Sequence, residues 1–236
     1  MALTPQNDEV FFREVDEELR RDQMKGFWLR YGWLVGGAVI LGLAIFAGVL
    51  AWRHHQQQKT GLAGEQFTQA LYDIGQGKRA AATATLDTLS KGPIDGYRAA
   101  ARMALAAAAL EKGDNKAAIA QYQAVAADDG LARPFRDVAL IRRTLLEFDT
   151  LPPATVVARL KPLAVEGNPW FGSAGELVAL SYIKLGKREL AGPLFAAIAR
   201  DPGVPEGLRS RALRMAGALG ADVATAGANP QDNAKE

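Results

Sequence analysis

The chain has 236 residues and a formal net charge of +2. A balance this close to neutral gives no indication of a nucleic-acid partner or of a strongly acidic substrate. The chain contains no cysteine, which excludes disulfides and fits an exported domain and a cytosolic domain equally well.

Residues 1–32 form a charged segment in which the stretch VFFREVDEELRRDQMKGF shows helical periodicity. Phe11, Phe12, Val15 and Leu19 recur at the spacing of one helix face, so the pattern predicts an amphipathic helix. Two interpretations remain open. The helix lies on the membrane surface with its arginines near anionic headgroups, or it docks on a partner.

The next segment, residues 33–52, is WLVGGAVILGLAIFAGVLAW and contains no charged residue. A helix needs about 20 apolar residues to cross a hydrocarbon core of about 30 Å, which is the length of this segment. A signal peptide has a shorter apolar region of about 7–15 residues behind a short basic start, and a buried helix of a soluble protein is a further alternative. Because Trp33 and Trp52 suit the two membrane interfaces, we expect a retained single-pass transmembrane helix.

The orientation of the span is predicted by the Lys and Arg residues near its ends. The window of about twenty residues after the span holds only Arg53 and Lys59. The window before it holds five such residues, which are Arg13, Arg20, Arg21, Lys25 and Arg30. This bias predicts a cytoplasmic N-terminus and places residues 53–236 on the outer side, which in a bacterial chain is the periplasm.

Small residues recur at four-residue spacing along the span. Gly32 and Gly36 form a GxxxG pattern, and Ala44 and Gly48 repeat the spacing. Small residues allow two helices to approach closely in lipid, where packing drives association. We therefore expect a helix–helix contact on this face, although glycine and alanine are common in spans.

Three glycines indicate internal repeats in residues 53–220. Gly77, Gly113 and Gly186 each follow an apolar helical stretch and precede an alanine-rich one, at separations of 36 and 73 residues. A tetratricopeptide unit is a helix–turn–helix of about 34 residues, and glycine supplies the left-handed backbone at a helix end. The spacing predicts four helix pairs, one of which lacks its glycine.

Small and aromatic residues at matching positions support these pairs, because a small residue lets the partner helix approach and an aromatic one fills the gap beside it. The residues that carry this pattern are Ala70, Ala82 and Leu86 in the first unit, Leu105, Ala106, Ala118 and Tyr122 in the second, and Val178, Ala179, Tyr182, Ala191 and Phe195 in the fourth. The third unit, residues 135–164, is degenerate and contains Pro152, Pro153 and Pro162. An alanine-rich helical bundle without repeats is the alternative.

Two further elements follow the fourth pair. A helix over residues 206–219, with Pro205 at its start, is expected to cap the array, because an end unit cannot leave its apolar face in water. Residues 221–236, ADVATAGANPQDNAKE, show no apolar periodicity and predict a disordered tail. The expected fold class is all-α, with one transmembrane helix followed by a tetratricopeptide-like array of helical hairpins, an α-solenoid.

No residue pattern indicates catalysis, a cofactor or a metal site. The two histidines, His54 and His55, are adjacent, and neighbours on a helix point in different directions, which makes a poor metal pair. We therefore expect a binding module and no enzyme. An anchored enzyme whose site is not visible in the sequence is the alternative from another class.

The first helix of each repeat is expected to line a concave groove, with a mixed apolar and charged surface that suits an extended polypeptide. Projection of the pattern places eight residues there, which are Met103, Ala107, Leu110 and Glu111, and Glu176, Leu180, Ile183 and Lys184. Ordinary contacts between stacked helices are the alternative for each of them.

The order of these parts, together with the stretches FFREVDEELRRD and RYGW, resembles the YfgM-like family of ancillary subunits of the SecYEG translocon. The resemblance spans the chain in topology and is most specific from Phe12 to Trp33. It implies a bacterial inner-membrane protein without catalytic residues that pairs with the translocon and with a PpiD-like periplasmic chaperone, and that helps to pass exported polypeptides to folding factors. A scaffold for another envelope assembly machine is the alternative.

Overall fold

In the computed structural model, which describes the backbone of residues 6–222 and the side chains of residues 29–222, every regular element is a helix. The helices are α1 (Gln6–Gly75), α2 (Arg79–Ser90), α3 (Asp95–Glu111), α4 (Asn115–Ala126), α5 (Arg133–Glu147), α6 (Pro153–Leu160), α7 (Phe171–Lys184), α8 (Arg188–Arg200) and α9 (Glu206–Ala218). The expected all-α class is therefore confirmed.

The chain divides into two compact units, with the boundary between Leu62 and Ala63. The first unit contains the part of α1 up to Leu62, which includes the predicted span. The residue limits predicted from the sequence for the amphipathic segment, the span and the array stay predictions. The side chains of the amphipathic segment up to Trp28 and the predicted tail from Val223 onward lie outside the described residues.

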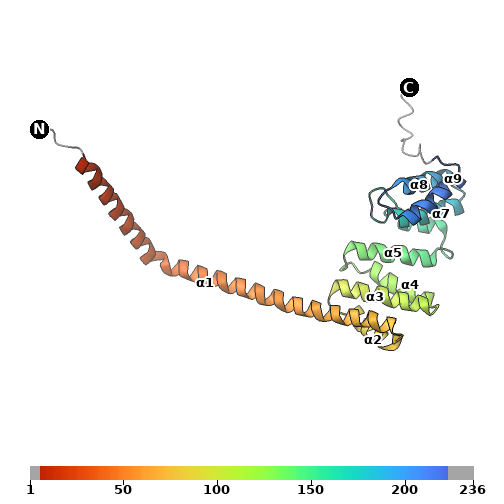
Figure 1. Ribbon diagram of the computed structural model, residues 1–236, viewed down its shortest axis with the longest axis horizontal. Helices are drawn as coiled ribbons and strands as arrows, with labels where there is room; N and C mark the ends of the chain where they lie inside the picture. Colours follow the sequence, from red (N-terminus) through yellow and green to blue (C-terminus); the bar gives the residue numbers. More distant parts are fainter. Residues whose placement is uncertain (1–5, 223–236) are drawn as a thin grey trace, which may run out of the picture. The chain divides into compact units, whose positions relative to one another are not determined.

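The second unit is a stack of helical hairpins (Figure 1). The end of α1 pairs with α2, α3 with α4, α5 with α6, and α7 with α8, and α9 packs on the last pair. Four buried apolar clusters follow one another along the stack, and each joins one hairpin to the helix after it. Contacts are therefore made between neighbouring units, as in a solenoid.

Glycine closes three of the four hairpins in the predicted way. Gly77, Gly113 and Gly186 have φ of 76°, 76° and 75°. After α3 the Gly113 amide donates to the Leu110 carbonyl at 2.9 Å and the Asp114 amide donates to Ala109 at 2.9 Å. These two hydrogen bonds form the Schellman motif, which gives partners to backbone carbonyls that lack one at the end of a helix.

Replacement of Gly113 by alanine is expected to destabilise the array by about 1–2 kcal/mol, because an L-residue with a side chain is strained in the left-handed region. An added Cβ would meet no atom within 4 Å, so the backbone conformation alone causes the loss. The measurement is the urea midpoint of the full chain in detergent. Gly96→Ala, on an exposed helical position of α3, is the matched control and should be neutral or slightly stabilising. Equal effects of the two changes would contradict the assignment.

The predicted repeat positions are confirmed as the packing positions. Ala70, Ala106, Ala118, Ala179 and Ala191 have no exposed surface. The aromatic and large aliphatic residues at the matching positions are also buried or half-buried, namely Leu86, Leu105, Tyr122, Val178, Tyr182 and Phe195. Small and large side chains thus alternate across each helix pair, which brings the helix axes close together.

The third hairpin replaces the glycine turn with prolines and an ion cluster. α6 is short and begins at Pro153 behind the extended residue Pro152, and it ends at Leu160, two positions before Pro162. Glu147 at the end of α5 accepts hydrogen bonds from Arg143 Nε at 3.1 Å and from Arg159 Nη1 of α6 at 2.5 Å. Arg159 Nη1 also donates to the buried Thr144 hydroxyl at 3.2 Å. The ion cluster therefore ties α6 to α5 where no glycine does.

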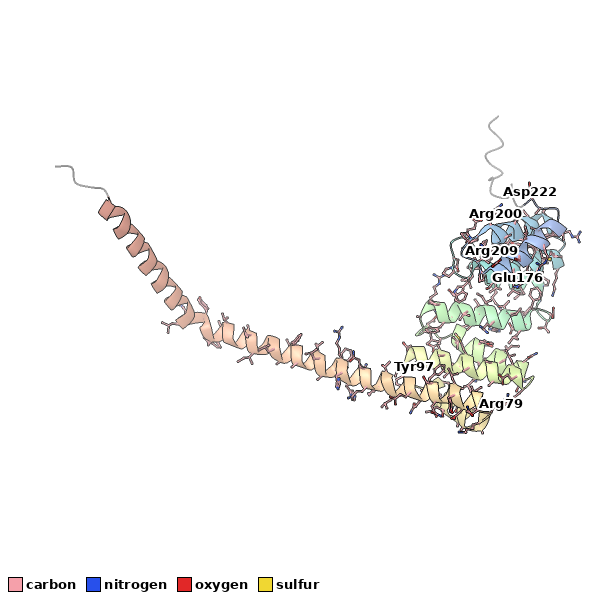
Figure 2. The ribbon with its side chains drawn as sticks, in the orientation of Figure 1. Arg79, Tyr97, Glu176, Arg200, Arg209 and Asp222 are labelled. Atoms are coloured by element: carbon pink, nitrogen blue, oxygen red, sulfur yellow. The ribbon has the colours of Figure 1, made fainter. Side chains whose placement is uncertain are left out.

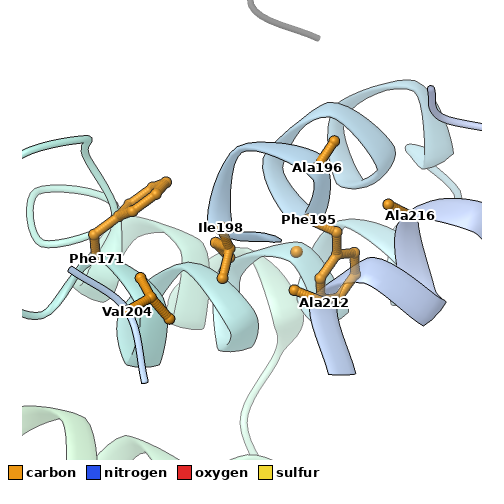
Figure 3. Close-up of a cluster of buried hydrophobic side chains, with 8 residues drawn as sticks. Phe171, Phe195, Ala196, Ile198, Val204, Ala212 and Ala216 are labelled. Atoms are coloured by element: carbon orange, nitrogen blue, oxygen red, sulfur yellow. The ribbon is translucent and has the colours of Figure 1, made fainter. Parts of the chain in front are cut away.

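The predicted cap corresponds to α9. Ala212 and Ala216 of α9 face the last hairpin, and Figure 3 shows the Phe195 ring of α8 beside Ala212. Gly172 of α7 allows close approach, because an added Cβ would lie 2.8 Å from Val204 Cγ1 in the segment before α9. Phe171, Ile198 and Val204 complete the buried cluster at this end. α9 therefore covers the apolar face that the fourth hairpin would otherwise expose.

Candidate protein-interaction surfaces

The apolar part of α1 is exposed along its whole length. Within Leu29–Gly75 the most apolar window has a mean hydropathy of 2.5, and none of it is buried. Large side chains such as Ile40, Phe46 and Trp52 are 70%, 63% and 65% exposed. Transfer of this surface into water would cost about 25 cal/mol per Å² of apolar area. The helix is long and apolar enough to span a membrane, and its surface suits lipid.

The small residues predicted to mediate a helix contact lie on the same exposed part of α1. Gly36, Ala44 and Gly48 are exposed and Gly32 is half-buried. A Cβ added at Gly36 or Gly48 would meet no atom within 4 Å. Their four-residue spacings put the members of each pair on one helix face. A second helix can therefore approach there, and the contact itself stays a prediction.

Two of the four residues predicted on α7 make polar contacts with other elements, and the other two pack against a buried cluster. Glu176 accepts two hydrogen bonds from Arg211 of α9, from Nε and from Nη2, each at 3.0 Å. Lys184 lies 4.0 Å from the centre of the Phe148 ring and 3.2 Å from Asp149 Oδ1, beyond the end of α5. Leu180 and Ile183 are half-buried against the cluster of α7, α8 and α9.

The four residues predicted on α3 divide between two surroundings. Met103 and Leu110 are half-buried and pack against the cluster of α3, α4 and α5. Ala107 and Glu111 are exposed and line a cleft that borders this packing face of the helix. The structure therefore brings Ala107 and Glu111 together on one surface and separates them from Met103 and Leu110.

This surface, which we call the first-hairpin cleft, has a volume of about 220 Å³ and lies between α1, α2 and α3. Its residues come from the end of α1, from α2, and from the second half of α3 and the residue after it. They are Leu71, Ile74, Arg79, Thr83, Leu86, Ala104, Ala107, Ala108, Glu111 and Lys112. Sequence reasoning did not identify this cleft. The run of alanines in α3 is the one feature of the sequence that could have indicated missing side-chain volume there.

Several ion pairs link neighbouring helices of the array. Burial acts to raise the pKa of the Glu147 carboxyl, but hydrogen bonds from Arg159 and Arg143 outweigh it and hold this pKa below its ordinary value. The hydrogen bonds to Glu176 raise the pKa of Arg211, which is already charged at all ordinary pH values. These pairs orient helices and indicate no proton-transfer role.

A family comparison gives the relation of the chain to known proteins. The family model described as a tetratricopeptide repeat-like domain matches residues 25–162, which is more than half of the chain. The chain belongs to this tetratricopeptide repeat-like family. The matched range contains the apolar part of α1 and the first three hairpins, and α7–α9 continue the same stacking. No curated protein and no solved structure gave a match.

Membership in the tetratricopeptide repeat-like family indicates the general role of the second unit. Arrays of this kind are helical scaffolds for protein interactions and are generally non-catalytic, because stacked hairpins create extended surfaces. His54 Nε2 accepts a hydrogen bond from the Gln58 amide nitrogen at 3.0 Å, and the two residues form an exposed pair one turn apart on α1. Across residues 29–222, no group of three His, Cys, Asp or Glu residues is placed to hold a metal ion.

Proposed function

We propose that the chain is a membrane-anchored periplasmic scaffold of the YfgM type, an ancillary subunit beside the SecYEG translocon. In this proposal the span of α1 sits in the bacterial inner membrane with a cytoplasmic N-terminus. The array faces the periplasm, where it works with a PpiD-like chaperone and hands exported polypeptides to folding factors.

The observation that carries the proposal is that α1 contains both an exposed apolar stretch and the first helix of the repeat array. α1 has a fully exposed apolar stretch, and its last part, from Ala63 to Gly75, is the first helix of the repeat array. The excess of Lys and Arg before the stretch favours export of the array. An anchor of this kind keeps a weak binding surface at high effective concentration near its partner.

The surface offered to polypeptides supports the same proposal. Exposed or half-exposed apolar groups alternate with charged ones along the first helices, with Leu71 and Tyr72 on α1, Leu145 on α5, and Leu180 beside Lys184 on α7. Large exposed apolar side chains that are rimmed by charges are typical of protein-interaction sites. An extended chain can contact several of these positions in succession.

The experiment is photo-crosslinking in intact cells, with a probe at Phe46 in the span and a probe at Ser173. Ser173 lies about two turns before Leu180 on α7 and is exposed, so a bulky probe fits there without disturbing the half-buried Leu180. We expect SecY from Phe46 and a chaperone or exported chains from Ser173. The control probe is Gln123, which is exposed on the second helix of its pair, and it should give few of these products.

Two results of the crosslinking experiment would contradict the proposal. A stable set of other envelope proteins without SecY would support a scaffold for another assembly machine and would contradict the translocon assignment. Crosslinks to exported chains at equal yield from Ser173 and Gln123 would contradict a defined polypeptide surface on the first helices.

A further inference from the structure

The first-hairpin cleft is an apolar space that no side chain of the array fills. Three alanines of α3, Ala104, Ala107 and Ala108, stand where larger residues would reach toward α1 and α2. Leu71 is 47% exposed at its mouth, whereas Leu86 at its base is buried. The volume of about 220 Å³ exceeds the approximately 150 Å³ of an engineered apolar cavity that holds benzene. One aliphatic or aromatic side chain fits into it.

The charges at the mouth of the cleft are basic on balance. Arg79 Nη2 donates to Glu111 Oε2 at 3.2 Å, so the acid that lines the cleft is shared with a base. Lys112 takes part in no ion pair among residues 29–222. Arg79 and Lys112 are both exposed. A carboxylate next to an inserted apolar side chain would find a free cation within reach, whereas a second base would meet repulsion.

The cleft adjoins the surface of the first helices at Leu71 and extends from there into the space between three helices. The cleft opens where α1 ends and α2 begins, and Arg79 lies at that end of the array (Figure 2). Its lining residues come from both helices of the first hairpin and from α3. A cleft between three helices suits a single inserted side chain of a partner, whereas an extended backbone would need a longer groove.

We propose that the first-hairpin cleft is an anchor site for a leucine-sized side chain of a partner polypeptide, next to which the partner carries an acidic residue. This inference rests on the proposed scaffold function and adds the sequence feature that the scaffold selects. The apolar side chain packs on Leu71, Leu86 and the alanines, and the carboxylate pairs with Lys112.

The test uses the full chain in detergent and a short Gly-Ser peptide with a central Asp-Leu-Asp in which photo-leucine replaces the leucine. Photo-leucine has nearly the size of leucine and reports its position by crosslinking. We expect crosslinks in the cleft, at Leu71 and at the alanine run of α3. Ala107→Leu fills the cleft and should reduce them about tenfold, as expected for loss of most of the burial of one leucine.

Two controls make the result specific. Ala120→Leu makes the same change at an exposed position of α4 outside the cleft and should leave the crosslinks unchanged. A peptide with Lys in place of both Asp residues should crosslink about threefold less, and Lys112→Glu should reverse this preference. Absent crosslinks, crosslinks spread over other helices, or equal yields from Ala107→Leu and the wild type would overturn the anchor site. The scaffold function would survive that result if the cellular crosslinks from Phe46 and Ser173 persist.

Discussion

Phe195→Ala is expected to destabilise the array by about 3–5 kcal/mol, the cost of a cavity left by a fully buried phenylalanine. The residue is 1% exposed and belongs to the buried cluster of α7, α8 and α9. Because units of a solenoid contact only their neighbours, we expect the loss to be concentrated at this end. Hydrogen exchange of the full chain should show α7–α9 opening, while α1–α3 keep most of their protection.

Leu213→Ala is the matched control for this prediction. Leu213 lies on α9 near the same cluster but is 50% exposed, so its truncation should change the unfolding free energy by no more than about 0.5 kcal/mol. Equal loss of protection from α2 to α9 in Phe195→Ala would show that the array unfolds as one cooperative unit. That result would contradict the nearest-neighbour description.

Glu147→Gln is expected to cost about 2 kcal/mol near neutral pH, since it leaves Arg143 and Arg159 side by side without their carboxylate. The Glu147 side chain is 14% exposed, so water screens the loss only in part. The ion pair between Glu147 and Arg159 links α6 to α5. The loss of unfolding free energy should be measurable by urea unfolding of the full chain. Glu166→Gln, at an exposed position of the loop before α7, is the control and should be nearly neutral.

The contribution of the Glu147 carboxylate to the free energy of unfolding is expected to depend on pH. Since the pKa of Glu147 is lower in the folded chain than in the unfolded one, its contribution is complete above the unfolded value of about 4.3 and disappears as the pH falls through the folded pKa. The difference between wild type and Glu147→Gln should therefore be largest near neutral pH and shrink below about pH 4. A difference that grows on acidification would contradict the role of the carboxylate.

The sequence predicted the hairpin turns and the packing positions because both depend on local chemistry. Gly77, Gly113 and Gly186 satisfy a left-handed turn that other residues strain to adopt, and the small-large alternation of Ala118 and Tyr122 is set within one helix pair. The capping helix after Pro205 was predicted for the same reason, since its signals lie within a few residues.

The surfaces were harder to predict, because the first helices of a solenoid have neighbours on more than one side. On α3, apolar periodicity puts Met103, Ala107 and Leu110 on nearly one face, and it cannot tell that Met103 and Leu110 pack toward α4 and α5 while Ala107 lines the cleft. The cleft itself depends on three helices and on volume that the alanines do not fill. The link from Glu147 to Arg159 likewise crosses a turn whose geometry no local pattern specifies.

Membrane orientation tests the account most directly, since every proposed partner depends on it. The chain has no cysteine, so single cysteines can be introduced as unique labels at Ala2 and at the exposed Ala120. A membrane-impermeant maleimide, applied to cells with a permeabilised outer membrane, should label Ala120→Cys at once and Ala2→Cys only after lysis. Labelling of Ala2→Cys in unlysed cells, with Ala120→Cys protected, would place the array in the cytoplasm and contradict the account.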